Sequence, residues 1–247
     1  MSDLVQSIRE RYLQALDNIA SAAHSAGRQP ESVKLVVVTK SQSVEVTRAA
    51  IEAGASMLGE NYPEEGVMKL QSLHEFSAVE WHMIGHVQSR KAQLVAENFN
   101  LLHSLDSLKL AKRLDRFCSE ARRMLPVLLE FNVGGEDSKS GWLAGDETLW
   151  PALLDEVASV IALPNLQVRG LMTMPPLSAT AEFSRPFFQK LKRLQEYLIS
   201  QFPRTTFIEL SMGTSGDYGV AVQEGATLVR VGTAIVGARQ YYKSEVG

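Results

Sequence analysis

The chain opens with a helical pattern of apolar positions. Apolar residues recur at helical spacing from Leu4 to Ile19, as expected for one buried face of an α-helix. Gly27 and Pro30 follow, and both residue types commonly end helices. We therefore expect a helical segment over residues 1–30, ahead of the main fold.

After this segment, one pattern repeats along the rest of the chain. A short run rich in β-branched or apolar residues is followed by a polar turn and an amphipathic helical stretch. The eight strand-like runs begin near Leu35, Met57, Glu80, Leu101, Leu125, Leu166, Thr206 and Leu228. Eight successive units favour an α/β fold, a closed (β/α)8 TIM barrel over about residues 35–240; an open doubly wound sheet is the alternative. With no linker in view, residues 1–247 are predicted to form a single domain.

Composition and charge exclude several classes of function. The chain has 247 residues, 45% of them apolar, and a formal net charge of −3. No basic surplus points to nucleic acid or to an anionic membrane surface. Charged residues interrupt the apolar positions of the N-terminal segment, which therefore lacks a signal-peptide core. The single cysteine, Cys118, cannot form an internal disulfide, so a cytoplasmic location is expected.

Polar side chains gather where the predicted strands end. These positions carry Lys40, Asn61, His86, Asp106, Asn132, Thr173, Ser211 and Thr233. Active sites of such barrels lie at the carboxyl ends of the strands, so these side chains are expected to share one mouth.

Lys40 is the first candidate for chemistry, because it directly follows a buried-looking strand. A lysine held there and partly desolvated has a lowered pKa, which frees its amine to attack a carbonyl. The alternative is a strand-end lysine that extends into solvent.

The last two predicted strands carry loops that suit a phosphate. Gly213 and Gly232 allow close approach of the backbone, and hydroxyls stand nearby on Ser211, Ser215 and Thr233. Many barrels bind phosphate with these two loops. Ordinary glycine turns with a hydroxyl helix cap are the alternative.

Arg230 lies on the last strand and shares the face of Gly232, two positions on. An inward arginine needs an anion or another acceptor, and a structural carboxylate is the alternative partner. His82 and His86 also share a strand face, but the pair favours packing or pocket lining over a metal site, and no metal is expected.

Together these motifs resemble the YggS family, also called the pyridoxal-phosphate homeostasis or PLP-binding protein family. The resemblance runs from Leu35 to Arg239 and is carried by VVVTK, GENYPEEGVMK, EWHMIGHVQSRK, GEDSKSG, GLMTM and ELSMGTSGDYGVAVQEGATLVRVGTAIVGAR. Arg90, Val87 and Tyr218 depart from the family pattern, which puts fine contacts near the third strand in doubt.

The resemblance implies a barrel like the N-terminal domain of alanine racemase (fold type III), with pyridoxal 5′-phosphate (PLP) at its mouth. Lys40 matches the lysine that forms the Schiff base, and Arg230 matches the arginine facing the pyridine nitrogen. The phosphate cup corresponds to Ser211, Gly213, Ser215, Gly232 and Thr233, and the ring surroundings correspond to Asn61, His82 and Met172.

The resemblance also implies a role in PLP homeostasis, as a carrier or buffer with little or no turnover. Arginine at the ring nitrogen leaves that nitrogen unprotonated, which weakens carbanion stabilisation. The racemase's second domain, which supplies a tyrosine base, is not seen; Tyr241 and Tyr242 are possible substitutes. A PLP-dependent racemase and a Schiff-base aldolase are the alternatives. PLP-requiring apo-enzymes are candidate partners, and a monomer is expected.

Overall fold

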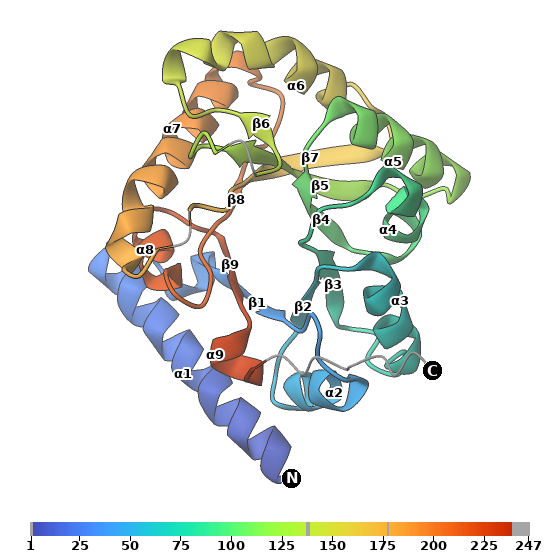
Figure 1. The fold of residues 1–247 in the computed structure, drawn as a ribbon, viewed down its shortest axis with the longest axis vertical. Helices are drawn as coiled ribbons and strands as arrows, with labels where there is room; N and C mark the ends of the chain where they lie inside the picture. The colour runs from blue at the N-terminus through green and yellow to red at the C-terminus, as the bar shows by residue number, and fades with distance from the viewer. Residues whose placement is uncertain (1, 137–138, 177, 239–247) are drawn as a thin grey trace.

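The computed structural model describes residues 2–136, 139–176 and 178–238. Eight parallel strands close into a ring in the order β1-β2-β3-β4-β5-β7-β8-β9, and helices surround it (Figure 1). The strands are β1 (Lys34–Val38), β2 (Met57–Glu60), β3 (Glu80–Met83), β4 (Leu101–Leu105), β5 (Leu125–Asn132), β7 (Leu166–Met172), β8 (Glu209–Ser211) and β9 (Leu228–Val231). The predicted TIM barrel is therefore confirmed.

Helices follow the strands around the outside of the barrel. They are α2 (Val44–Glu52), α3 (Pro63–Ser72), α4 (Ala92–Asn98), α5 (Leu108–Glu120), α6 (Leu154–Ile161), α7 (Arg185–Gln201), α8 (Tyr218–Gln223) and α9 (Thr233–Val236). Four short 3₁₀ helices join them: η1 (Pro30–Ser32), η2 (Ser89–Lys91), η3 (Glu147–Leu153) and η4 (Ala181–Ser184). No helix in the described ranges is long and apolar enough to cross a membrane.

The predicted N-terminal helix is present as α1 (Asp3–Ser25). Ser2 caps it, since its side chain accepts a hydrogen bond from the backbone N–H of Val5. The helix packs against α8, α9 and α2 (Figure 1). Because α8 has six residues and α9 has four, they cover little of the barrel wall, and α1 supplies the missing apolar face.

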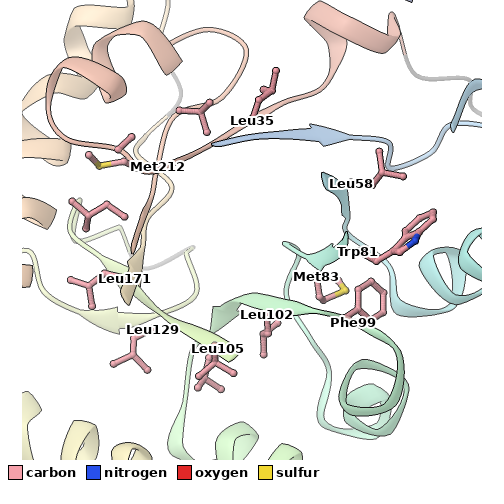
Figure 2. Close-up of a cluster of buried hydrophobic side chains, with 14 of the residues drawn as sticks. Leu35, Leu58, Trp81, Met83, Phe99, Leu102, Leu105, Leu129, Leu171 and Met212 are labelled. Atoms are coloured by element: carbon pink, nitrogen blue, oxygen red, sulfur yellow. The ribbon is translucent and has the colours of Figure 1, made fainter. Parts of the chain in front are cut away.

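Alternation along each strand separates two environments. Outward-facing side chains form the main core between barrel and helices, as Figure 2 shows for Leu35, Leu58 and Trp81. Inward-facing Val36, Leu128, Met172 and Leu228 form a separate small cluster inside the barrel. The barrel interior therefore has little apolar filling, and polar side chains occupy much of the rest.

Two local features differ from the predicted strands. The seventh run begins at Glu209 rather than near Thr206, because the Phe207 carbonyl accepts a hydrogen bond from the Gln195 side chain and Ile208 is exposed. A further short strand, β6 (Trp142–Leu143), pairs with β5 outside the closed ring. A two-residue strand is too short for the alternation of apolar positions to reveal.

Candidate functional site

The carboxyl ends of the strands surround a cavity of about 420 Å³, which we call the upper pocket. Its polar lining comes from Lys40, Asn61, His86, Ser104, Glu130, Thr214, Ser215, Arg230 and Thr233. Four of the eight polar side chains expected to share one mouth line this pocket, namely Lys40, Asn61, His86 and Thr233, whereas Asp106, Asn132, Thr173 and Ser211 do not. The pocket lies on the face where barrels of this kind carry active sites.

Arg230 is a buried cation in the wall of the upper pocket. It is 3% exposed, and one nitrogen, Nη1, donates to the Ser211 hydroxyl. The other, Nη2, donates to the Thr173 carbonyl oxygen at 3.0 Å. Burial lowers the Arg230 pKa to about 10, so the group stays charged at neutral pH. Among the described residues no carboxylate lies within ion-pair distance of it, which leaves a positive charge facing the pocket.

Two loops meet on the side of the pocket next to Arg230. The backbone N–H of Gly232 donates to the Ser215 hydroxyl at 3.2 Å, which joins the loop after β8 to the loop after β9. A Cβ at position 232 would lie 3.2 Å from the Val38 carbonyl oxygen, so glycine permits this close approach. Thr214 and Thr233 add hydroxyls at the same place. Small hydroxyl residues and close backbone suit a small anion such as phosphate.

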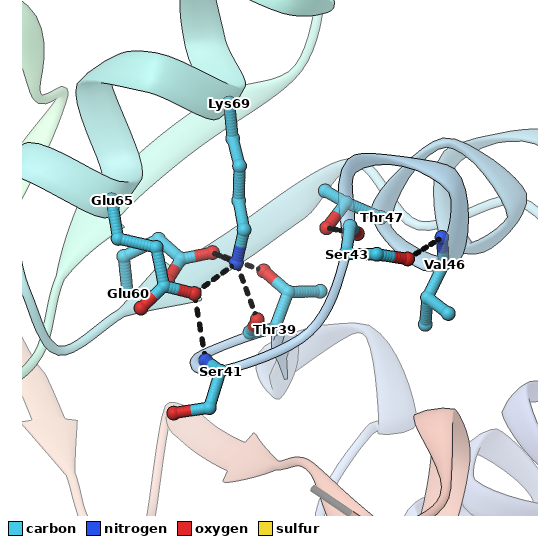
Figure 3. A network of polar contacts seen from close by, with 8 residues as sticks. All are labelled: Thr39, Ser41, Ser43, Val46, Thr47, Glu60, Glu65 and Lys69. Atoms are coloured by element: carbon cyan, nitrogen blue, oxygen red, sulfur yellow. Dashed lines mark hydrogen bonds and ion pairs between the residues drawn. The ribbon is translucent and has the colours of Figure 1, made fainter. Parts of the chain in front are cut away.

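A buried ion-pair network holds the backbone on both sides of Lys40 (Figure 3). The fully buried Lys69 donates to the Thr39 carbonyl oxygen at 2.6 Å and to carboxylates of Glu60 at 2.9 Å and Glu65 at 2.6 Å. Glu65 also accepts from the backbone N–H of Ser41 at 2.7 Å. Ser41 has a φ of 56°, a left-handed conformation that costs energy outside glycine. The network therefore stabilises the turn that directs Lys40.

Glu130 lies in the pocket lining across the barrel from Lys40. It is 8% exposed, and its Oε2 has no hydrogen-bond partner. Burial, reinforced by the charge of Asp106, raises the Glu130 pKa to about 7. An acceptor this deeply buried is expected to meet a donor from a bound ligand, or to carry a proton itself.

His86 and Asp106 pair at the outer rim of the pocket, with His86 Nδ1 and Asp106 Oδ2 2.8 Å apart. His82 points into the barrel interior, away from His86, and so the two histidines do not form one cluster. No group of three potential metal ligands occurs in the part of the chain that the structure describes.

Comparison with known proteins matches this geometry. Residues 13–240 match the family model for the N-terminal domain of alanine racemase. A relative from Vibrio alginolyticus, named pyridoxal phosphate homeostasis protein, is 41% identical over 96% of this chain and 100% of its own length. The solved structure of PipY from Synechococcus elongatus with PLP bound is 36% identical, with a TM-score of 0.76, over 89% of this chain and 100% of that one. An alanine racemase from Clostridium difficile, 15% identical with a TM-score of 0.67 over 93% of this chain and 59% of that one, shares the fold.

The chain belongs to the pyridoxal phosphate homeostasis protein family. For this family member, the residues assigned from the sequence divide into two groups. Seven of the ten line the upper pocket together: Lys40, Asn61, Met172, Ser215, Arg230, Gly232 and Thr233.

The other three, His82, Ser211 and Gly213, are not among the residues lining the upper pocket. Ser211 lies behind Arg230 and accepts its hydrogen bond. Gly213 has a φ of 89° and a Cβ there would lie 2.5 Å from Ala221, so it shapes the loop after β8. His82 lies deeper in the barrel and lines a cavity at its opposite end. Their assignment as cofactor-binding residues stays a prediction.

Two features of this homeostasis-family site were not predicted from the sequence: the buried Glu130 and the ion-pair network around Lys69. Glu130 was read as part of an apolar strand, although its position alternates with the outward Leu129 and Phe131. Glu65 and Lys69 have the spacing of a helical ion pair, which was the available signal for the network beside Lys40. Tyr241 and Tyr242 lie outside the described residues.

We expect Lys69→Met to destabilise the fold by about 3–5 kcal/mol, because it leaves the fully buried carboxylate of Glu60 and the partly buried carboxylate of Glu65 without their cation. Urea unfolding measures the change. The exposed Lys109→Met is the matched control and should change stability by less than about 0.5 kcal/mol. A loss below about 1 kcal/mol for Lys69→Met would mean that the network contributes little.

Glu130 should make stability depend on pH. Its folded pKa of about 7 lies above the ordinary 4.5, so the folded state binds the proton more tightly and its stability falls as pH rises from 4.5 to 7. Glu130→Gln removes this penalty. Relative to wild type, the variant should gain about 2–3 kcal/mol in unfolding free energy between pH 5 and pH 8. If the stability difference between Glu130→Gln and wild type were the same at pH 5 and pH 8, the raised pKa of Glu130 would be contradicted.

Proposed function

We propose that this protein binds PLP in the upper pocket, with Lys40 forming the Schiff base, and acts in intracellular PLP homeostasis as a carrier or buffer. The observation that carries the proposal is the convergence of three groups in one pocket: the Lys40 amine, the Arg230 cation and the loops joined by Ser215 and Gly232. The PLP-bound relative PipY, 36% identical, supports the same assignment.

The donor set suits this cofactor at each of its functional groups. When bound, PLP supplies an aldehyde for amines and an electron-accepting ring. The loops around Ser215 and Gly232 would hold the phosphate, and Lys40, in the turn after the neighbouring β1, would reach the aldehyde carbon. Arg230 would donate to the pyridine nitrogen, while Asn61 and Met172 would contact the ring.

Arg230 also explains why carriage is favoured over catalysis. A guanidinium can only donate, so it keeps an unprotonated nitrogen opposite it. An unprotonated ring withdraws electrons weakly, which raises the barrier for breaking a bond at the amino-acid Cα. Arg230 retains its proton at neutral pH even in its buried site. The residues of this chain therefore bind and orient the cofactor without activating it strongly.

We further propose that the chain is a single-domain monomer of the cytoplasm that exchanges PLP with PLP-requiring apo-enzymes. The relatives named as homeostasis proteins support the role. The alternatives are a PLP-dependent racemase of fold type III, which the shared fold with alanine racemase favours, and a Schiff-base aldolase.

Borohydride reduction should fix PLP to the peptide that contains Lys40, because reduction makes the imine bond permanent. Peptide mass mapping identifies the site. Lys40→Ala should lose the adduct and the visible absorbance band, yet keep weaker binding through the phosphate loops. Lys91→Ala, at the rim, should retain the adduct. An adduct on Lys69, Lys91 or Lys139 would contradict the assignment of Lys40. A protein that takes up no PLP would contradict the whole proposal and favour the aldolase.

Amino-acid turnover should be far below enzymic rates. We expect exchange of the Cα proton in deuterated water slower than about one per second for a panel of L- and D-amino acids. NMR follows the exchange, with an authentic alanine racemase as the positive control. Faster exchange by the PLP-loaded protein would contradict the carrier function and support the racemase function.

A further inference from the structure

A chain of hydrogen bonds crosses the barrel interior behind Arg230. Arg230 donates to the hydroxyl of Ser211, whose Oγ lies 2.7 Å from His103 Nδ1. His103 Nε2 lies 3.0 Å from His82 Nδ1, and His82 Nε2 lies 3.2 Å from Glu80 Oε2. The first four side chains are at most 3% exposed.

This chain connects the two ends of the barrel. Arg230 lines the upper pocket, whereas His82 and Glu80 line a cavity of about 270 Å³ at the amino ends of the strands, which we call the lower pocket. The bond between Ser211 and His103 joins β8 to β4, which are not neighbours in the ring. No apolar layer separates the two pockets along this route.

When both histidines are neutral, the residues at the two ends give every bond one direction. Arg230 can only donate, so the Ser211 oxygen accepts and its hydrogen is left for His103. At the far end, the hydrogen bond from His82 lowers the Glu80 pKa, so Glu80 is an anion at neutral pH and can only accept. Both constraints give the same pattern, in which each group donates toward Glu80.

The pattern assigns the tautomers of both histidines. His103 accepts at Nδ1 and donates from Nε2, and His82 does the same. Burial, the neighbouring His82 and the charge of Arg230 hold the His103 pKa well below its usual range, so this ring is neutral. Bonds that all point one way polarise one another, and the Ser211 oxygen becomes a stronger acceptor for Arg230.

We propose that His103 is a positioning residue for Arg230, and that the chain transmits the charge state of the Glu80–His82 pair in the lower pocket to Arg230 in the upper pocket. The effect on the cofactor rests on the proposed function, because Arg230 is the group assigned to the ring nitrogen. The chain itself exists whether or not PLP is bound.

Uptake of one proton reverses the pattern. A protonated His82 donates from both nitrogens, so His103 must accept at Nε2 and donate from Nδ1 to Ser211. Ser211 then accepts from both sides, and its hydrogen loses its partner. The charged groups that face this end are Lys34, Glu80, Arg169 and Glu209. Glu209 lies 3.3 Å from Lys34 and 3.9 Å from Arg169, so Glu80 is the anion bonded to His82.

The first test uses the protein without PLP. Long-range ¹H–¹⁵N NMR at neutral pH should show the Nε2–H tautomer for both His82 and His103. On acidification, His103 should change to the Nδ1–H tautomer as His82 gains its proton. An Nδ1–H tautomer of His103 at neutral pH would overturn the proposed direction. This result does not depend on PLP binding, so it separates failure of the chain from failure of the proposed function.

The second test follows the visible band of the PLP-loaded protein against pH. We expect the visible band to change when His82 gains its proton on acidification. Glu80→Gln removes the anion that favours protonated His82, so this change should move to lower pH. The control Glu97→Gln removes an exposed charge in α4 and should leave the profile unchanged. A Glu80→Gln profile identical to wild type would overturn the coupling.

Variants at His103 test its positioning role directly. His103→Phe cannot accept from Ser211, so it should shift the band at neutral pH and lose the acid-side change. His103→Gln can accept from Ser211 and donate to His82, and should restore the band at neutral pH. If His103→Phe folds and its visible band equals that of wild type, the positioning role of His103 is overturned. If that variant does not fold, the pH profile of Glu80→Gln tests the coupling instead.

Discussion

The buried charge of Arg230 is the constraint on which the barrel interior depends. A guanidinium inside a barrel requires acceptors, because its desolvation otherwise costs roughly several kcal/mol. Here the acceptors are neutral: the Ser211 hydroxyl and the Thr173 carbonyl oxygen. Each neutral acceptor satisfies a donor without cancelling the charge. The pocket therefore keeps a cation that a ligand acceptor can use, and His103 and His82 continue the polar interior behind it.

Much of the fold follows from alternation along the strands. A parallel barrel buries both faces of its strands, and the outward positions must be apolar to pack against helices. Leu35, Val37 and Leu58 satisfy that requirement, which made the strands visible in the sequence. The inward face of the same strands is free to vary. Lys40, Arg230 and Gly232 stand out there because charged or glycine residues are unusual beside apolar neighbours, and so the main candidate residues could be predicted.

The height of a residue along the barrel axis could not be predicted in the same way. Alternation gives the face of a side chain, but its level depends on the stagger between strands, which only the closed ring sets. His82 pairs in register with Leu101 and Ser211 with Leu228, which places both below the mouth. The contact between Ser211 and His103 spans 108 positions of sequence. No local pattern carries such information, so this contact could not be predicted from the sequence.

Lys69 and Lys40 lie on opposite sides of the turn after β1, and one has a structural role while the other is the candidate for chemistry. Lys69 lies on the outer side of β1, and its ammonium donates to Glu60, Glu65 and the Thr39 carbonyl oxygen. Lys40, one residue beyond Thr39, lines the upper pocket on the inner side together with Arg230. The network therefore holds the backbone on the outer side of the turn, while the side chain of Lys40 lies on the pocket side.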